Sequence, residues 1–472
     1  MRVVRRFTSG RGDGVRKAFF LAVLAIAAVG AMALAGAGSA AKPSKGVSTA
    51  VPRVAGSHIG VGAVRQVGVR NYAGPNCPGA GWNCTTATRV LQIATAGGDN
   101  VAQCTGGTLN TTAGQKCTIE QHGANNTARC FERINAPDTS QLCDITQTGA
   151  KNTAIVDQQI ISTNNSGEFG DQTATVRQGS LAAGSSALNS VQLSQSVMQN
   201  SGGEGNAPSG DVQEQEGYQT AAVTQYASGS GNNESQIDQS EAQFAHGASM
   251  QLQNMVPNGT DCAPSVGSIG PNICANVFQK AVNGNNTNRL NQSLDQKAKS
   301  NSDGADQWQG THDGGIDGQV HQATDPSGPG SSSNTANESK TQDESAPSGA
   351  TQTQIDPMSC CGFASQFGSD RATETINQTV NEHASEAAAD QSVDLEGTSN
   401  SLGTCTFNQH ATINIDSASQ NASVGPPCPY QGASIECASV IILSPIGDFI
   451  GDVVVAQQVG GGCSVFPPEN QG

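Results

Sequence analysis

The chain has 472 residues, of which 57 are Gly, only 4% are aromatic and only 13% are charged, and its formal net charge is −16 at pH 7. So few large apolar side chains cannot offset the conformational entropy that an ordinary packed globular core would cost. Regular hydrogen-bonded stacking suits this composition better, and so does plain disorder. The negative charge disfavours nucleic acid and anionic lipid as partners.

Residues 1–40 have the features of a bacterial secretion signal peptide. A basic segment precedes an apolar run from Ala18 to Ala35, and small residues around Ala40 form a cleavage pattern. Because the apolar run is just long enough to span a bilayer, a retained transmembrane anchor is the alternative. With the signal removed, we expect a secreted or cell-surface protein without an integral membrane span. Residues 41–75 are expected to form a linker.

Residues 76–165 contain a repeat with a period of 26, and such a repeat determines the architecture of a chain. Four cysteines lie in this segment at intervals of thirteen residues. The columns of identical residues are Ile93, Ile119 and Ile145; Gly97, Gly123 and Gly149; Asn100, Asn126 and Asn152; and Ala102, Ala128 and Ala154.

Each repeat unit is expected to form a strand, a tight turn and a second strand. Residues 117–121 and 126–130 both alternate between inward and outward positions, and a turn signal separates them. One such pair cannot bury its apolar face alone, whereas a stack of units can. In that stack, identical amides would bond to their copies above and below. The residues expected in these ladders are Gln121, Asn126, Gln147 and Asn152.

This unit resembles the curlin repeat of bacterial amyloid fibre subunits, which runs Gln-x-Gly-x-x-Asn-x-Ala-x-x-x-Gln. Every position of that pattern is matched by Gln147, Gly149, Asn152, Ala154 and Gln158. The copy that begins at Gln121 matches except for Glu132 in the last Gln position. The cysteines and the longer unit depart from the family, and the match covers roughly residues 90–160. The resemblance implies a curlin-like β-solenoid and self-association.

All 14 Cys lie beyond residue 76, and an even number in an exported chain predicts disulfides. Column mates in a parallel stack lie about 4.8 Å apart, within the range that a disulfide accepts. This spacing favours Cys104–Cys130 with Cys117–Cys143, and Cys117–Cys130 across the arch is the competing pairing. Elsewhere, the short separations favour Cys77–Cys84 and Cys262–Cys274.

In residues 166–299 the phase of the repeat is lost, but an apolar-x-Gln signature keeps returning. These residues are either strands of the same stack with uneven loops or a disordered Gln/Asn/Ser-rich tract. The signature ends at Gln178, Gln195, Gln199, Gln225 and Gln239.

The remaining chain divides into a spacer and a C-terminal region. Residues 300–358 are poor in apolar side chains, which predicts a flexible low-complexity spacer that includes Ser332 and Ser333. Residues 359–472 are rich in Cys and contain alternating and apolar runs. They are expected to form a small disulfide-tied β region.

No constellation of residues points to catalysis. The seven His are scattered without metal-ligand spacing, and we find no nucleophile elbow, phosphate-binding loop or paired carboxylates. We therefore expect no catalytic residues, no cofactor and no metal, and predict that the protein is not an enzyme.

The sequence favours an exported, all-β, repeat-built structural protein of the cell surface or extracellular matrix. Self-association is the expected interaction, with other surface or matrix components as further partners. The alternative is a monomeric, disulfide-stabilised secreted adhesion or binding module.

Overall fold

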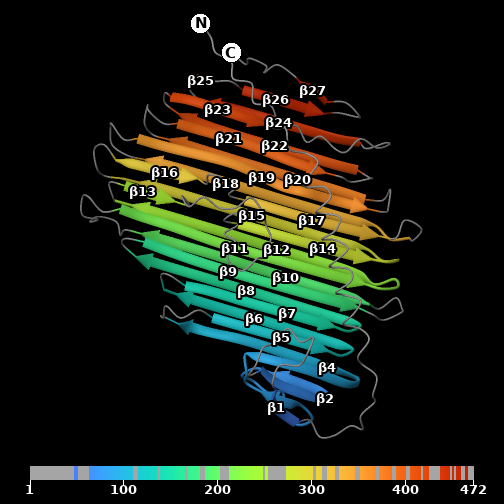
Figure 1. Cartoon of the computed structure of the whole chain (residues 1–472). Helices are drawn as coiled ribbons and strands as arrows, with labels where there is room; N and C mark the ends of the chain where they lie inside the picture. Colours follow the sequence, from blue (N-terminus) through green and yellow to red (C-terminus); the bar gives the residue numbers. More distant parts are fainter. Residues whose placement is uncertain are drawn as a thin grey trace, which may run out of the picture.

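The described part of the protein consists mainly of parallel β-strands stacked in chain order (Figure 1). The structure is a computed structural model that describes residues 47–51, 63–109, 115–136, 139–164, 167–180, 187–201, 212–247, 250–253, 273–300, 305–310, 316–324, 329–345, 351–367, 372–384, 390–399, 404–415, 418–424, 436–446, 449–450, 453–458 and 463–465. Within 47–51, within 351–367 and from 390 onward it describes the backbone alone. The expected signal peptide lies outside the described residues.

The strands form two columns, and each turn of the chain adds one rung with a strand in each column. Column A consists of the first halves of β2 (Ala63–Ala73) and β4 (Arg89–Leu109), then β5 (Gln115–His122), β7 (Thr139–Thr148), β9 (Gly167–Ser180), β11 (Val212–Ala227), β13 (Met250–Gln253), β14 (Ile273–Ala281), β16 (Asp306–Gly310), β17 (Ile316–Thr324), β19 (Thr351–Phe367), β21 (Asp390–Ser399), β23 (Ala418–Val424), β25 (Phe449–Ile450) and β26 (Val453–Gln458).

Column B continues from the second halves of β2 and β4. It then contains β6 (Asn125–Asn135), β8 (Lys151–Asn164), β10 (Leu188–Ser201), β12 (Asn232–His246), β15 (Asn286–Lys299), β18 (Ser332–Ser345), β20 (Ala372–Ala384), β22 (Thr404–Ile415) and β24 (Glu436–Ile446). The all-β prediction is confirmed, since the described residues contain strands and no helix.

The register explains why the repeat phase is lost after residue 165. Successive paired Asn residues are 26 residues apart at Asn126 and Asn152, but 37, 44 and 53 residues apart in the rungs that follow. The strands still pair in register, so the extra residues lie between strands and do not shift the stack. Residues 166–299 are therefore strands of the same stack, wherever they are described.

The core lies between the two columns and is narrow. Strands such as β12 and β15 alternate between buried and partly or fully exposed residues along their length. At one of the inner positions, a larger aliphatic side chain in column B faces a small one in column A. Leu290 and Gly318 show this relation directly, because a Cβ at Gly318 would lie 2.6 Å from a Leu290 methyl carbon.

Two segments that we predicted to be irregular belong to the stack. The expected linker, residues 41–75, contains β1 (Val47–Val51) and β2. The expected spacer, residues 300–358, contains β16, β17 and β18. The prediction of a flexible spacer is wrong for these strands, because Ser and Asn replace aliphatic residues inside the stack. Ser332 and Asn334, for example, are both buried.

The C-terminal region also differs from the expected separate unit. Strands β19 to β24 continue the same two columns, and β26 pairs antiparallel with β27 (Cys463–Val465) near the end of the described residues.

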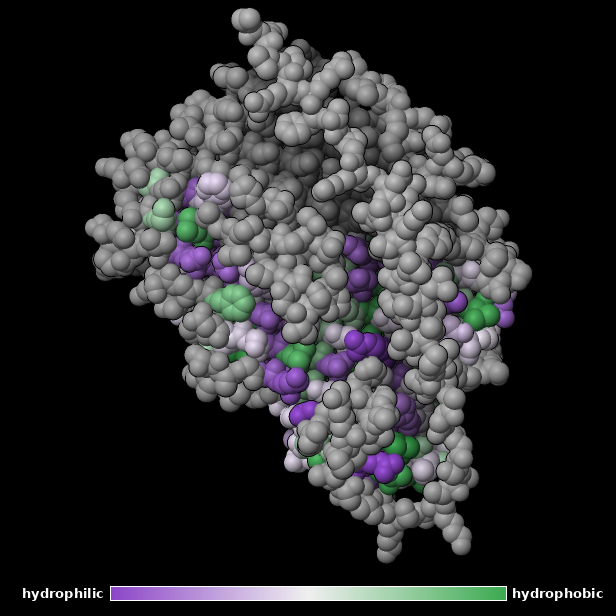
Figure 2. Space-filling view, in the orientation of Figure 1, coloured by the Kyte–Doolittle hydropathy of each residue, from purple (hydrophilic) through white to green (hydrophobic). Residues whose placement is uncertain are grey.

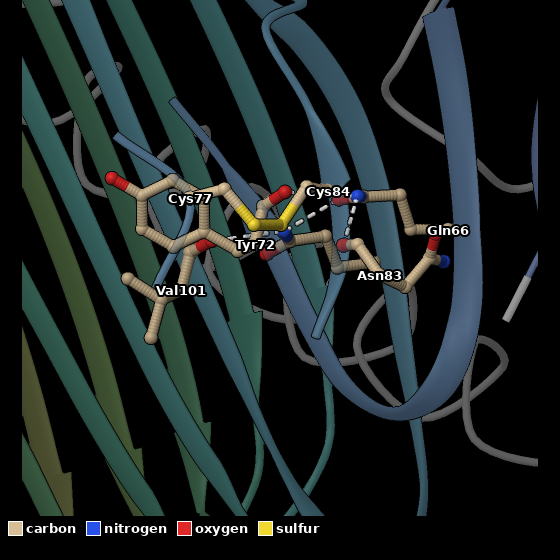
Figure 3. The surroundings of a disulfide bond; sticks show 7 residues. Gln66, Tyr72, Cys77, Asn83, Cys84 and Val101 are labelled. Atoms are coloured by element: carbon tan, nitrogen blue, oxygen red, sulfur yellow. Dashed lines mark hydrogen bonds between the residues drawn. A yellow bond between two sulfur atoms is a disulfide. The ribbon is translucent and has the colours of Figure 1, made fainter. Parts of the chain in front are cut away.

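Short strands cover the N-terminal end of the stack. Strand β1 pairs antiparallel with the first half of β2, and β3 (Asn83–Thr85) pairs with its second half. The loop that carries β3 is tied by the disulfide Cys77–Cys84, as predicted (Figure 3). Beside this disulfide, the Gln66 amide donates to the Tyr72 and Asn83 carbonyl oxygens.

Stacked arches bring glycine backbones into close contact. A Cβ at Gly149 would collide with the Gly123 carbonyl oxygen, whereas a Cβ at Gly179 would meet no atom within 4 Å. We expect Gly149→Ala to lower the free energy of unfolding by about 1–3 kcal/mol, because the backbone must shift to relieve the overlap. Gly179→Ala is the matched control and should change it little. Denaturant melts of both variants check this, and equal effects would contradict it.

Candidate functional site: amide ladders, buried cysteines and a polar outer face

The Gln residues predicted to form a ladder lie in an inner row of column A, which we call the Gln ladder. Each side-chain amide donates to the carbonyl oxygen of the Gln one rung earlier, over 2.7–2.9 Å. Every one of these Gln side chains is buried. The Gln ladder consists of Gln66, Gln92, Gln121, Gln147, Gln178, Gln225, Gln279 and Gln322.

The predicted Asn residues lie in a matching row of column B, which we call the Asn ladder. Here each amide donates to the Asn one rung later, over 2.8–2.9 Å, so the two ladders run in opposite directions. The last amide of the row donates to the Ser332 hydroxyl. The Asn ladder consists of Asn71, Asn100, Asn126, Asn152, Asn189, Asn233 and Asn286.

Both ladders also connect the two columns. Gln121 donates to the Thr127 carbonyl oxygen at 3.0 Å, from column A to column B. Asn126 donates to the Thr148 carbonyl oxygen at 3.0 Å, from column B to column A. Each amide therefore holds its neighbours within a column and across the arch, where water does not compete for its bonds.

Further amide rows lie deeper along the strands, and sequence reasoning identified only some of their members. The recurring apolar-x-Gln signature was the usable signal, since all five of its Gln residues before residue 240 are buried. A second inner row of column B runs Glu132, Gln158, Gln195, Gln239 and Gln292. Shorter rows include Gln199, Gln243, Gln296 and Gln342, and also Gln251 and Gln307.

Glu132 begins the second inner row in place of a Gln. It is 1% exposed, and its carboxylate accepts a hydrogen bond from Gln158 at 2.8 Å. Burial raises the pKa of Glu132 from 4.5 to about 7, although the Gln158 hydrogen bond opposes this. The residue that occupies a Gln position of this row is thus a buried acid whose pKa is raised to about 7.

The disulfide in the repeats is neither of the pairings considered from the sequence. Cys104 of β4 is bonded to Cys117 of β5, with the Cα atoms 6.1 Å apart. Cys104 and Cys130 are neighbours within column B, as are Cys117 and Cys143 within column A, but they are not bonded. The prediction of bonds along the columns is wrong because the two columns approach closely enough at this rung for a bond across the core.

The other cysteines are described less completely. Cys274 of β14 is disulfide-bonded, and its predicted partner Cys262 lies outside the described residues. The side chains of the C-terminal cysteines also lie outside them.

A polar groove of about 450 Å³ lies on the outer face of column B. One of its rows is a partly buried amide ladder in which Asn377 donates to Asn337, Asn337 to Asn291, and Asn291 to Asp238. Hydroxyl side chains form the row beside it, at Ser240, Ser293, Ser339 and Thr379. Among the described residues visible in Figure 2, hydrophilic and hydrophobic residues are intermixed.

The described residues hold no group of three or more His, Cys, Asp or Glu side chains that could bind a metal ion. No helix among them has the length and hydrophobicity to cross a membrane. No protein-family model, curated protein or solved structure matches the chain.

Proposed function

We propose that this chain is an exported structural protein of the cell surface or extracellular matrix, built as a curlin-like β-solenoid that self-associates. The observation that carries the proposal is the Asn ladder, which continues through seven rungs despite insertions between them. A chain that maintains register through insertions is suited to rigidity and length. Nothing in that arrangement requires a cavity for a substrate.

The two ends of the stack determine how copies would associate. Strands β1 and β3 cover the N-terminal end, so another copy cannot add there without displacing them. At the other end, β24 has no further partner in column B among the described strands. Exposed strand edges are sites where another chain can pair. We therefore propose that copies associate at the C-terminal end.

A second candidate function is the monomeric adhesion or binding module, and two observations favour it. The covered N-terminal end prevents unlimited growth of a fibre. The groove on column B offers rows of amides and hydroxyls to a polar partner such as a glycan.

Assembly of the mature chain tests the first proposal. We expect sedimentation to show that the mature chain self-associates. In the variant Ser48→Pro with Ala50→Pro, proline disfavours the pairing of β1 with β2, so copies should also add at the N-terminal end. Fibre diffraction of this variant should then show a spacing of about 4.8 Å along the fibre. If both proteins remain monomeric at high concentration, self-association is excluded and the binding module takes its place.

A further inference from the structure

The rung above the disulfide Cys104–Cys117 repeats its geometry with two free thiols. Cys130 is the register partner of Cys104 between β4 and β6, and Cys143 is that of Cys117 between β5 and β7. Both thiols are fully buried and hydrogen-bond to each other. The pair Cys130 and Cys143 is therefore equivalent in register to the pair Cys104 and Cys117. The Cα atoms of Cys104 and Cys117 are 6.1 Å apart, a separation that suits a disulfide.

Packing alone does not require cysteine at these two positions. In the next four rungs, the same positions hold a larger aliphatic residue that faces a small one. These pairs are Val156 with Ala174, Leu193 with Ala221, Ile237 with Ala275, and Leu290 with Gly318. Two consecutive rungs have cysteine at both positions of this pair. In the first of them the columns are close enough for the two sulfur atoms to bond.

We infer that Cys130 and Cys143 form a second disulfide across the core, stacked directly on Cys104–Cys117. The oxidant is an external disulfide, supplied by an oxidoreductase or by a small molecule. One cysteine thiolate attacks it and releases one thiol of the oxidant. The other cysteine thiolate then attacks the mixed disulfide and releases the second thiol. Two protein thiols are oxidised and one external disulfide is reduced.

Burial of the two thiols in the folded core determines at which stage of folding this bond can form. Burial raises the pKa of both thiols, and for Cys130 the neighbouring Cys143 adds to the effect. Since the thiolate is the reactive form, the folded rung reacts slowly with external disulfides. The bond therefore forms before β6 and β7 close onto the stack, and it is afterwards protected from reductants.

Trypsin can show the connectivity directly, because it separates the four cysteines onto four peptides. These are residues 90–116, 117–129, 130–133 and 134–151. The mature chain is refolded with oxidised glutathione, denatured with an alkylating agent at acidic pH, and digested without reduction. We expect 130–133 linked to 134–151, and 90–116 linked to 117–129.

A matched variant separates the bond from the packing. Cys130→Val with Cys143→Ala copies the Val156 and Ala174 pair of the next rung, so it removes the thiols and maintains the packing. We expect the oxidised wild-type protein to unfold at a higher temperature than the oxidised variant. After both proteins are unfolded and refolded in reductant, that difference should disappear.

Three outcomes would overturn the inference. One is alkylation of both Cys130 and Cys143 in the oxidised protein. Another is linkage along the columns, Cys104 to Cys130 and Cys117 to Cys143. The third is an unfolding-temperature difference between wild type and variant that is the same with and without reductant, since it would then come from packing alone.

Discussion

Replacing Asn126 and Asn152 together by Ala should lower the free energy of unfolding by about 2–6 kcal/mol, because each buried amide removed leaves partners unsatisfied at about 1–3 kcal/mol. Asn100 loses its acceptor in the Asn ladder, and Asn189 loses its donor. The ladder lies within one chain, so the loss should be measurable in the monomer. Denaturant melts measure the total. Hydrogen exchange should show that strands β6 to β10 lose protection first, since coupling in a stack is to nearest neighbours.

The control is Asn125→Ala, which lies beside Asn126 but on the outer face. Its amide donates to the partly exposed Asp99 at the surface, so its removal should cost little. The pair Ser332 and Ser333 does not suit this purpose, because Ser332 is buried and accepts a hydrogen bond from Asn286. If Asn125→Ala and the double variant destabilise the protein equally, the ladder has no special role.

Glu132→Gln should stabilise the protein at alkaline pH and leave it nearly unchanged at about pH 4.5. The pKa of Glu132 is raised by burial from 4.5 to about 7, so the folded protein holds this proton more tightly than the unfolded chain. Stability is therefore highest below the unfolded pKa and falls as pH rises through the folded pKa. At about 1.4 kcal/mol for each pH unit, Glu132 costs about 3 kcal/mol at about pH 8.

Glutamine at this position also completes the second inner row of column B. It would still accept from Gln158, and its amide could donate to the Leu142 carbonyl oxygen. That carbonyl is the register equivalent of the Thr173 carbonyl oxygen, which accepts from Gln158. Thermal melts at the two pH values measure the effect, with the exposed Glu234→Gln as control. A gain that is the same at both pH values would show that ionisation of Glu132 is not its cause.

Much of the stack could be predicted from the sequence because in-register parallel pairing makes equivalent residues spatial neighbours. Asn126 and Asn152 share a column in the sequence and also share a hydrogen bond in the structure. The apolar-x-Gln signature is kept despite the insertions for the same reason. Each buried Gln side chain forms a hydrogen bond with the equivalent amide in the neighbouring rung. These features depend on local alternation and on a period, and both can be read along the chain.

Three features were decided only by the tertiary structure. The bond Cys104–Cys117 depends on how closely the two columns approach at that rung, and the spacing of cysteines along the sequence does not give this distance. The covering of the N-terminal end depends on β1, which pairs antiparallel with β2. The residues of β1 are not part of the sequence repeat, so the repeat does not predict this strand. The strands in residues 300–358 have a composition typical of a spacer. They form strands because the preceding rungs offer backbone groups and side-chain amides that need hydrogen-bond partners. Those unpaired groups belong to the stack, so they cannot be recognised in the sequence of the segment itself.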